Sequence, residues 1–446
     1  MADSREYPTG RVAAAVVVPA TTGAALEAPR FGYRWTIVAM LFFATTINYI
    51  DRQVMGILGP TLQTELGWTT KQFGDVVSWF QFAYGLGFLG VGRLLDRIGV
   101  KKGFALAIAT WSLAAMSHAL ARTAVGFSIA RAALGLGESA NFPASIKAVA
   151  EWFPKKERAF ATGIFNAGSN VGAIVGPIVV PIIALSIGWR YAFLFTGLLV
   201  VIWLIAWWRI YHEPENHPWV KPAELAYIRS DRGAGEDEDA TRIPWYRVLA
   251  HRQAWGFIIA KSMTDPVWWF YLFWLPTFLD TEYGIKLSHL AAPLVVCYVA
   301  ADFGSIFGGW LSGAIIKRGH SVNFGRKLAM AIAAILIVPT MFAPRSGTMW
   351  LAVAIVSVAL ASHQWWSANI FTTASDMFPR KAVAFIVSIG GFGGAICGWG
   401  FQRIVGRVLQ ATGNNYTPIF LYCGLAYVTA WLILQALAPR LQTVEL

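Results

Sequence analysis

The sequence predicts an all-α membrane protein whose twelve transmembrane helices form two pseudo-symmetric six-helix bundles. Three observations predict it: an apolar composition, apolar stretches of membrane-spanning length along the whole chain, and local patterns that recur half a chain apart. Of the 446 residues, 56% are hydrophobic and 13% are charged, and the mean hydropathy is +0.52. Because a soluble domain of this length is not so apolar, the membrane is the expected solvent.

The apolar stretches recur often enough for twelve crossings. A helix needs about 20 apolar residues to cross about 30 Å of hydrocarbon, since its backbone polar groups must bond within the helix. The expected spans are 34–56, 76–95, 102–121, 124–149, 158–184, 189–211, 253–280, 290–317, 326–344, 347–375, 381–407 and 415–438.

The basic residues predict the orientation in the membrane. The net charge of +12 would suggest nucleic acid, but the basic residues sit in short loops that fall on one side. That side is expected to be cytoplasmic, with both termini inside, in the inner membrane. No nucleic acid partner is expected. The residues on the basic side are Arg93, Arg97, Lys101, Lys102, Lys155, Lys156, Arg158, Lys317, Arg318, Arg326, Lys327, Arg380 and Lys381.

The longest connection divides the chain. It contains the acidic run Glu236 to Asp239 and is expected to be a cytoplasmic linker. On either side of it the pattern Phe153-Pro154-Lys155-Lys156 is matched by Phe378-Pro379-Arg380-Lys381 at one constant offset. Duplicated halves favour a carrier with its site between them and alternating access. The expected parts are a disordered tail 1–33, bundles 34–211 and 253–438, a linker 212–252 and a tail 439–446.

The sequence offers nothing that an enzyme or a cofactor would need. Cys297, Cys397 and Cys423 are an odd number and all lie inside apolar spans, so neither a disulfide framework nor a metal site is expected. Neither a nucleotide-binding glycine loop nor a nucleophile constellation is present. We therefore expect no enzyme, no metal and no cofactor.

The segment from Gly92 to Lys102 carries the first resemblance. With its Gly, Asp, Arg and Gly at positions 92, 96, 97 and 99, it resembles the loop between the second and third helices of the major facilitator superfamily. The resemblance implies gating or structural roles for Gly92, Asp96, Arg97 and Gly99, with close helix approach at the glycine and a charge latch at Asp96. Gly313 stands where the second half would have the Asp, which weakens a latch there.

Further blocks narrow the resemblance. Asn48 to Arg52 and Arg131 to Pro143 resemble the anion:cation symporter family. Glu151 to Arg158, Gly163 to Asn170 and Ser367 to Pro379 are similar to its bacterial hexuronate transporters. The likeness covers nearly the whole chain apart from the tail and the linker. It implies a proton-coupled symporter, with the proton gradient as driving force, that imports an anionic sugar acid such as glucuronate or galacturonate. Aldonates remain an alternative class of substrate. The protein is expected to be a monomer in the bilayer.

Four charges within the spans are the candidate coupling residues: Asp51, Arg52, Arg131 and Glu138. An ionised side chain at membrane depth costs at least about 2.5 kcal/mol, so each needs a partner or a function. Static salt bridges between the first and fourth spans are one interpretation. Four charges exceed what helix association needs, however, so a functional interpretation is favoured.

Our hypothesis is that a proton and the substrate stabilise the same state. Ionised Asp51 and Glu138 neutralise the nearby arginines, and burial favours the neutral acids when a proton arrives. The freed guanidinium then binds the substrate carboxylate, for which its planar fork is suited. Arg52 is the first choice for this contact, with Arg131 orienting Glu138 or sharing the anion. The resemblance likewise implies proton roles for Asp51 and Glu138.

Sugar hydroxyls need additional polar partners. For each of these an interhelical hydrogen bond or an interfacial aromatic is an equally good interpretation, except that the resemblance favours Tyr49 and Tyr84. The other candidates are Gln81, Asn166, Ser169, Asn170, Gln364, Asn369, Thr372 and Thr373.

Other charged residues suggest structural roles. Lys261 and Asp265 are expected to pair with each other, His363 to be a neutral hydrogen-bonding residue, and Asp376 to be a cap or an ion pair. The role of Asp302 is open.

Two other functions are weighed against import. Gly163, Gly172, Gly176 and Pro177 fit much of a glycine-rich signature of superfamily antiporters, although plain close packing explains glycines at these spacings equally well. A sensor that binds a solute without moving it would use the charged linker for a partner. The two arginines favour an anionic cargo, which argues for the symporter.

Overall fold

The computed structural model describes residues 32–230 and 244–445. The expected N-terminal tail, apart from its last two residues, and the acidic run of the linker lie outside this part. All regular elements in the described ranges are helices.

The first half contains seven α-helices. They are α1 (Arg34–Ile57), α2 (Gly59–Leu66), α3 (Thr70–Ser117), α4 (Ala124–Glu138), α5 (Asn141–Trp152), α6 (Lys155–Ile187) and α7 (Trp189–Ile210).

The connection and the second half follow. Short helices η1 (Pro214–Asn216), α8 (Pro222–Arg229) and α9 (Trp245–Leu249) lie in the connection. The second half comprises α10 (Arg252–Tyr283), η2 (Leu287–His289), α11 (Ala291–Lys317), α12 (Val322–Leu336), η3 (Val338–Arg345), α13 (Met349–Met377), α14 (Arg380–Ala411) and α15 (Thr417–Leu437).

The twelve predicted spans map onto these helices. The second and third spans are continuous in α3, which bends at Gly99, where φ is +76°, a value that glycine adopts without strain. The fourth span is α4 followed by α5. Eight helices of the described ranges are long and apolar enough to cross a membrane. Of the remaining spans, α4 and α5 are each too short to cross a membrane alone, with 15 and 12 residues, while α1 and α10 carry buried charges.

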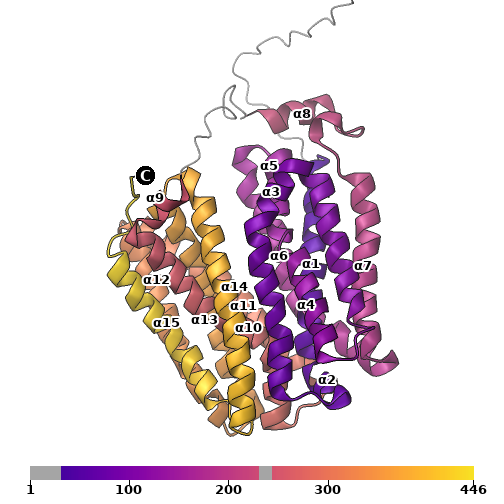
Figure 1. Ribbon diagram of the computed structural model, residues 1–446. Helices are drawn as coiled ribbons and strands as arrows, with labels where there is room; N and C mark the ends of the chain where they lie inside the picture. The colour runs from indigo at the N-terminus through magenta and orange to yellow at the C-terminus, as the bar shows by residue number, and fades with distance from the viewer. Residues whose placement is uncertain (1–31, 231–243, 446) are drawn as a thin grey trace, which may run out of the picture.

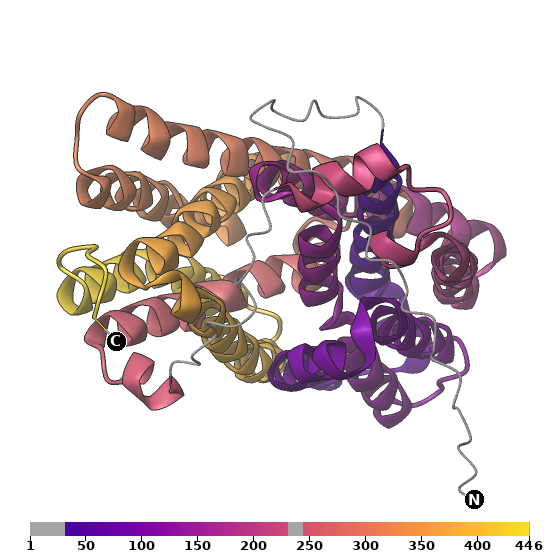
Figure 2. The same cartoon turned by 90° about the horizontal axis from the view of Figure 1, so that it is seen from above.

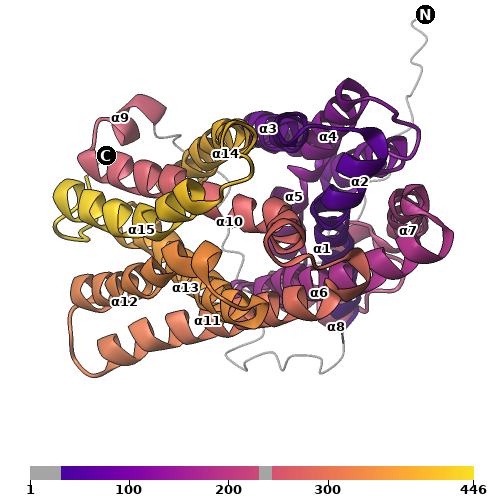
Figure 3. The ribbon, with the colours of Figure 1, turned by 90° about the horizontal axis from the view of Figure 1, so that it is seen from below.

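The helices form two bundles (Figure 1). α1 to α7 make up one and α10 to α15 the other, and α1 begins at the same end of the molecule at which α15 ends. Figure 2 and Figure 3, seen from the two ends, show α3 beside α14 and α6 beside α11. These two pairs and α1 with α10 carry most of the packing between the bundles.

The bundles are bonded to each other at the end that carries α2. Asp75 of α3 accepts from Arg403 Nε of α14 at 2.8 Å, and the Lys71 amide donates to Gln410 Oε1 at 3.1 Å. A Cβ at Gly74 would lie 2.8 Å from the carbonyl oxygen of Gln402, so the glycine permits this close crossing. Toward the opposite end, which carries α8, the ribbons of the two bundles diverge (Figure 1).

Glycines also set the separation of α1 and α6. A Cβ at Gly168 would lie 2.3 Å from the Phe42 carbonyl oxygen, and one at Gly172 would lie 2.4 Å from that of Thr46. Close packing therefore accounts for Gly172 of the antiporter-like signature. A Cβ at Gly163, in contrast, would meet no atom within 4 Å.

The connection between the bundles is attached to the first one. Glu224 of α8 accepts from the backbone amides of Tyr33 at 2.9 Å and Arg34 at 3.0 Å, which caps the beginning of α1. Arg34 Nε in turn donates to Glu157 of α6 at 3.0 Å. The segment around α8 is thus a packed element that joins α1 to α6.

Candidate transport site between the two bundles

The centre of the candidate site is an ion pair between Arg52 of α1 and Glu138 at the end of α4. Arg52 donates to Glu138 Oε2 from Nε at 3.0 Å and from Nη2 at 2.9 Å, and Nη2 also donates to Asn48 Oδ1 at 3.2 Å. The side chains are 3% and 0% exposed. Asn48 precedes Arg52 by one helical turn, which places both on the same face of α1.

Aromatic rings surround the Arg52 guanidinium. Its Cζ lies 4.8 Å from the Tyr49 ring, 5.3 Å from Phe80, 5.0 Å from Tyr84 and 5.2 Å from Trp269. Rings at this distance attract a cation through their faces. Trp269 belongs to α10, so both bundles contribute to this cage.

Arg131 of α4 lies against two aromatic rings. Its Cζ lies 4.5 Å from the Phe80 ring and 5.1 Å from the Phe273 ring of α10, and the residue is 0% exposed. Within the described residues, none of its three guanidinium nitrogens has a hydrogen-bond partner. Such a group is costly to bury without an acceptor, which makes Arg131 the candidate for binding an anion.

Asp51 faces the interior of the first bundle. It is buried, and the charges of Glu138 and Arg131 act on it electrostatically. Neither of its carboxylate oxygens has a hydrogen-bond partner in the described part of the chain. The four predicted charges are therefore brought together, but within that part only Arg52 and Glu138 form a direct ion pair among them.

Comparison with known proteins identifies the scaffold that holds these charges. The sequence profile of the Major Facilitator Superfamily matches residues 41–401. The chain belongs to this superfamily. Its helices superpose on the inward open structure of the xylose transporter XylE from E. coli with a TM-score of 0.71 and 15% identity, covering 91% of this chain and 97% of that one, which supports the shared fold.

Two relatives in this superfamily are similar over most of their length. The hexuronate transporter of Escherichia coli K12 is 29% identical over 91% of this chain and 94% of its own. A probable galactarate/D-glucarate transporter of Bacillus subtilis 168 is 29% identical over 90% and 91%. The superfamily and its members are transporters, which agrees with the prediction that this chain is not an enzyme.

The superfamily loop is only partly as predicted. Asp96 accepts from Lys147 Nζ of α5 at 2.8 Å, so the acid does latch to a neighbouring helix. Arg97 is exposed, and Gly99 supplies the positive φ of the bend. The prediction that helices approach closely at Gly92 is wrong, because a Cβ there would meet no atom within 4 Å.

The first-bundle polar candidates are placed unevenly. Gln81 is buried against α14, where a Cβ at Gly398 would lie 2.5 Å from its Oε1, and its amide lacks partners among the described residues. On α6, Ser169 donates to the Asn166 carbonyl oxygen at 2.6 Å, while Asn170 is half-buried and Asn166 exposed. Gln81 is therefore a buried polar group without partners within the described ranges, and Trp269 of the cage lies near the same glycine.

Three of the second-bundle candidates of α13 bond to backbone oxygens, and substrate contact by these residues stays a prediction. Asn369 donates to the carbonyl oxygens of Gly308 at 3.1 Å and Trp365 at 3.0 Å. Thr372 and Thr373 donate to backbone oxygens of their own helix at 2.6 and 2.7 Å, and Gln364 is half-buried. For Asn369 the structure shows the interhelical hydrogen bond that was the alternative interpretation.

The other charged residues form local contacts. Lys261 and Asp265 pair at 2.9 Å, Asp376 pairs with Arg326 at 3.4 Å, and His363 Nδ1 bonds to the Tyr427 hydroxyl, as predicted for each. Asp302 is half-buried on α11. In the described ranges no three His, Cys, Asp or Glu side chains group as a metal site would require.

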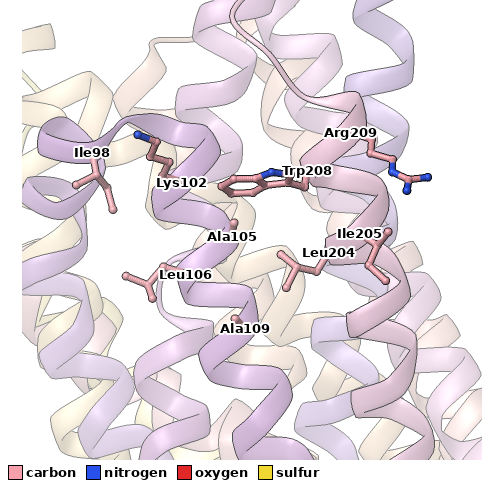
Figure 4. A pocket seen from close by; sticks show the side chains of 9 residues that line it. All are labelled: Ile98, Lys102, Ala105, Leu106, Ala109, Leu204, Ile205, Trp208 and Arg209. Atoms are coloured by element: carbon pink, nitrogen blue, oxygen red, sulfur yellow. The ribbon is translucent and has the colours of Figure 1, made fainter.

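A surface groove of about 710 Å³ lies apart from this site, between the second part of α3 and α7. Figure 4 shows its apolar lining, with Lys102 and Arg209 at one end and Ala109 at the other. Because it contains none of the four buried charges and Leu106 and Ile205 are exposed, it is a groove of the outer, lipid-facing surface.

Sequence reasoning missed the rings around the cations. Phe80, Phe273 and Trp269 sit in apolar helices, where an aromatic residue gives no signal of its own. Their spacing could have indicated them. Phe80 precedes Tyr84 by one turn of α3, and Trp269 precedes Phe273 by one turn of α10, so each pair shares a face.

Proposed function

We propose that the chain is a proton-coupled symporter that imports an anionic sugar acid across the inner membrane by alternating access. The observation that carries this proposal is Arg131, a fully buried guanidinium that lies against two aromatic rings and has no hydrogen-bond acceptor among the described residues. A carboxylate is the anion whose two oxygens match the guanidinium fork. The names of the two relatives supply the sugar acid class.

The adjacent ion pair supplies the coupling to protons. While Glu138 is ionised it holds Arg52 through two hydrogen bonds to one oxygen. A proton on Glu138 removes that attraction, and Arg52 then turns to the substrate carboxylate beside Arg131. The bound anion and the bound proton thus stabilise the same state, which is the thermodynamic requirement for symport.

Asp51 serves as the second acid in this scheme. It shares the electrostatic surroundings of Glu138 and Arg131, so its protonation depends on theirs, and the two acids titrate as a set. Tyr49 and Tyr84 lie beside Arg52 and offer hydroxyl groups to the sugar, and Gln81 offers a buried amide without partners in the part of the chain that the structure describes. Arg131 is the standing anion contact and Arg52 the one that the proton releases.

The test is uptake of radiolabelled galacturonate by purified protein in liposomes. An acidic exterior is expected to drive accumulation in the wild type, and Arg131→Gln is expected to lower it at least tenfold. Arg229→Gln is the control, since that arginine pairs with Glu215 on the surface. Absence of gradient-driven accumulation of any hexuronate or aldonate by the wild type would refute the proposal and would leave the sensor alternative.

The antiporter alternative receives no independent support from the geometry. Gly172 and Gly176 lie against α1, where close packing is sufficient to explain them. Efflux of substrate from preloaded liposomes, driven by protons that move inward, is the result that would favour the antiporter.

A further inference from the structure

A second charged pair lies in the other bundle, on α10. Lys261 Nζ lies 2.9 Å from Asp265 Oδ2 and also 4.2 Å from the centre of the Phe371 ring of α13. The lysine side chain is 5% exposed and the aspartate 23%. The ammonium is therefore covered by its partner and a ring, while the carboxylate is the more open group.

The carboxylate lies on the face of α10 that meets the first bundle. Asp265 and Trp269 are one turn apart, so they share a face, and Trp269 covers Arg52 at 5.2 Å. On α14, a Cβ at Gly394 would lie 2.3 Å from Asp265 Oδ2, and Ala395 lies 3.0 Å from the Cβ position of Gly85 on α3. Asp265 is thus about 6 Å along α10 from Trp269 of the cage, near the contact between bundles.

We propose that Asp265 makes the transporter selective for sugar acids with one carboxylate over those with two. This inference rests on the function proposed above. With the substrate carboxylate on Arg131 and Arg52, the other end of a six-carbon chain points toward Asp265. There the aspartate accepts hydrogen bonds from neutral hydroxyls and repels a second carboxylate. Such repulsive elements are a common source of discrimination between similar ligands.

Lys261 acts on the substrate through Asp265. Its ammonium donates to the aspartate and orients it, and the Phe371 ring together with Asp265 keeps the ammonium away from an incoming anion. The pair accordingly presents a negative group to the substrate, although it contains one charge of each sign. Relatives named for hexuronates and relatives named for galactarate or glucarate must accept different chemical groups at this end of the substrate.

Galactonate and galactarate are matched probes for this inference, because both are open-chain acids that differ only at one end, a hydroxymethyl group against a carboxylate. Galacturonate is the third probe. Binding is measured by ligand-induced thermal stabilisation of the purified full chain and by competition against uptake in liposomes. The wild type is expected to bind galactarate at least about tenfold more weakly than the better-bound monocarboxylate.

The selectivity ratio is the affinity for the better-bound monocarboxylate divided by the affinity for galactarate. Asp265→Asn is expected to lower this ratio about tenfold, since it removes the repulsion and frees Lys261 for the second carboxylate. Because the lone ammonium can impair folding, the double variant Lys261→Met with Asp265→Asn is made as well. It lacks both charges and is expected to narrow the ratio at least about threefold, but less than Asp265→Asn. Asp376→Asn, which breaks the Arg326 pair elsewhere, is the matched control and should leave the ratio unchanged.

The outcomes separate this inference from the function on which it rests. If the wild type binds a monocarboxylate but binds galactarate equally well, or if folded variants at Asp265 leave the ratio unchanged, the selectivity inference is wrong and the symporter proposal stands. If none of the three acids binds, both fail.

Discussion

Arg131 combines a cost to stability with a role in binding. Its guanidinium is 0% exposed and lacks an acceptor within the described residues, so its burial is not compensated by hydrogen bonds in the unliganded protein. Replacing it by Met removes that cost and keeps most of the side-chain volume that packs against Phe80 and Phe273. We predict that Arg131→Met stabilises the unliganded protein by about 1–3 kcal/mol, seen as a higher unfolding temperature, and abolishes stabilisation by galacturonate.

A control at the same residue sharpens this prediction. Arg131→Lys keeps the charge but loses the flat fork, so it should bind at least about tenfold more weakly without the gain in unfolding temperature. A destabilised Arg131→Met protein would show that the arginine is a structural element, as in the static salt-bridge interpretation.

In the proposed scheme, Glu138 gives substrate binding its dependence on pH. Binding takes up a proton in our scheme, so affinity for galacturonate should be highest at low pH and fall as pH rises. In Glu138→Gln the neutral amide replaces the protonated acid, and we predict that affinity becomes much less dependent on pH while accumulation driven by a gradient is lost. Counterflow exchange should persist, because it needs no net proton movement; loss of counterflow would contradict the assignment of Glu138 to coupling.

At the scale of elements, α8 acts as a cap for α1. Glu224 accepts two backbone amides of the first turn and lies 3.5 Å from the Arg34 guanidinium. We predict that Glu224→Ala destabilises the first bundle by about 1–3 kcal/mol, measured as a lower unfolding temperature. Glu213→Gln, at an exposed position of the same connection, is the control. Equal unfolding temperatures for all three proteins would mean that the attachment of α8 contributes nothing.

The contact between α1 and α6 depends on a missing side chain. A Cβ at Gly172 would overlap the backbone of Thr46 and lie 2.8 Å from Tyr49 Cβ, so α6 would have to move away from a residue of the cage. Gly172→Ala is therefore predicted to lower both the unfolding temperature and galacturonate affinity, the latter at least about tenfold. Gly163→Ala on the same helix, where space is open, should leave both unchanged. Loss of transport in Gly163→Ala without loss of stability would instead support the antiporter signature.

For the molecule as a whole, the sequence predicts the helices better than the site. Hydropathy and charge are properties of single segments, so the twelve spans and the four buried charges can be found without coordinates. The partner of each charge cannot, because Arg52 meets Glu138 across 86 positions of sequence and Trp269 reaches the cage from the other bundle. The short α2 and the docking of α8 were likewise missed, since both depend on tertiary contacts of polar loops.

The arrangement of the bundles predicts that a crosslink at the α2 end stops transport. Thr70 Oγ1 of α3 lies 3.3 Å from Asn414 Oδ1, just after α14, in the region where the bundles are bonded to each other. Alternating access requires this end to open. Thr70→Cys with Asn414→Cys, joined by a short thiol crosslinker in a Cys397→Ser background, is predicted to abolish uptake, and a cleavable crosslinker should restore it upon reduction. Each single cysteine variant controls for modification alone. Unchanged uptake by a fully crosslinked protein would mean that the two bundles need not separate here, and the rocking motion assumed for the carrier would have to be replaced by one confined to the α8 end.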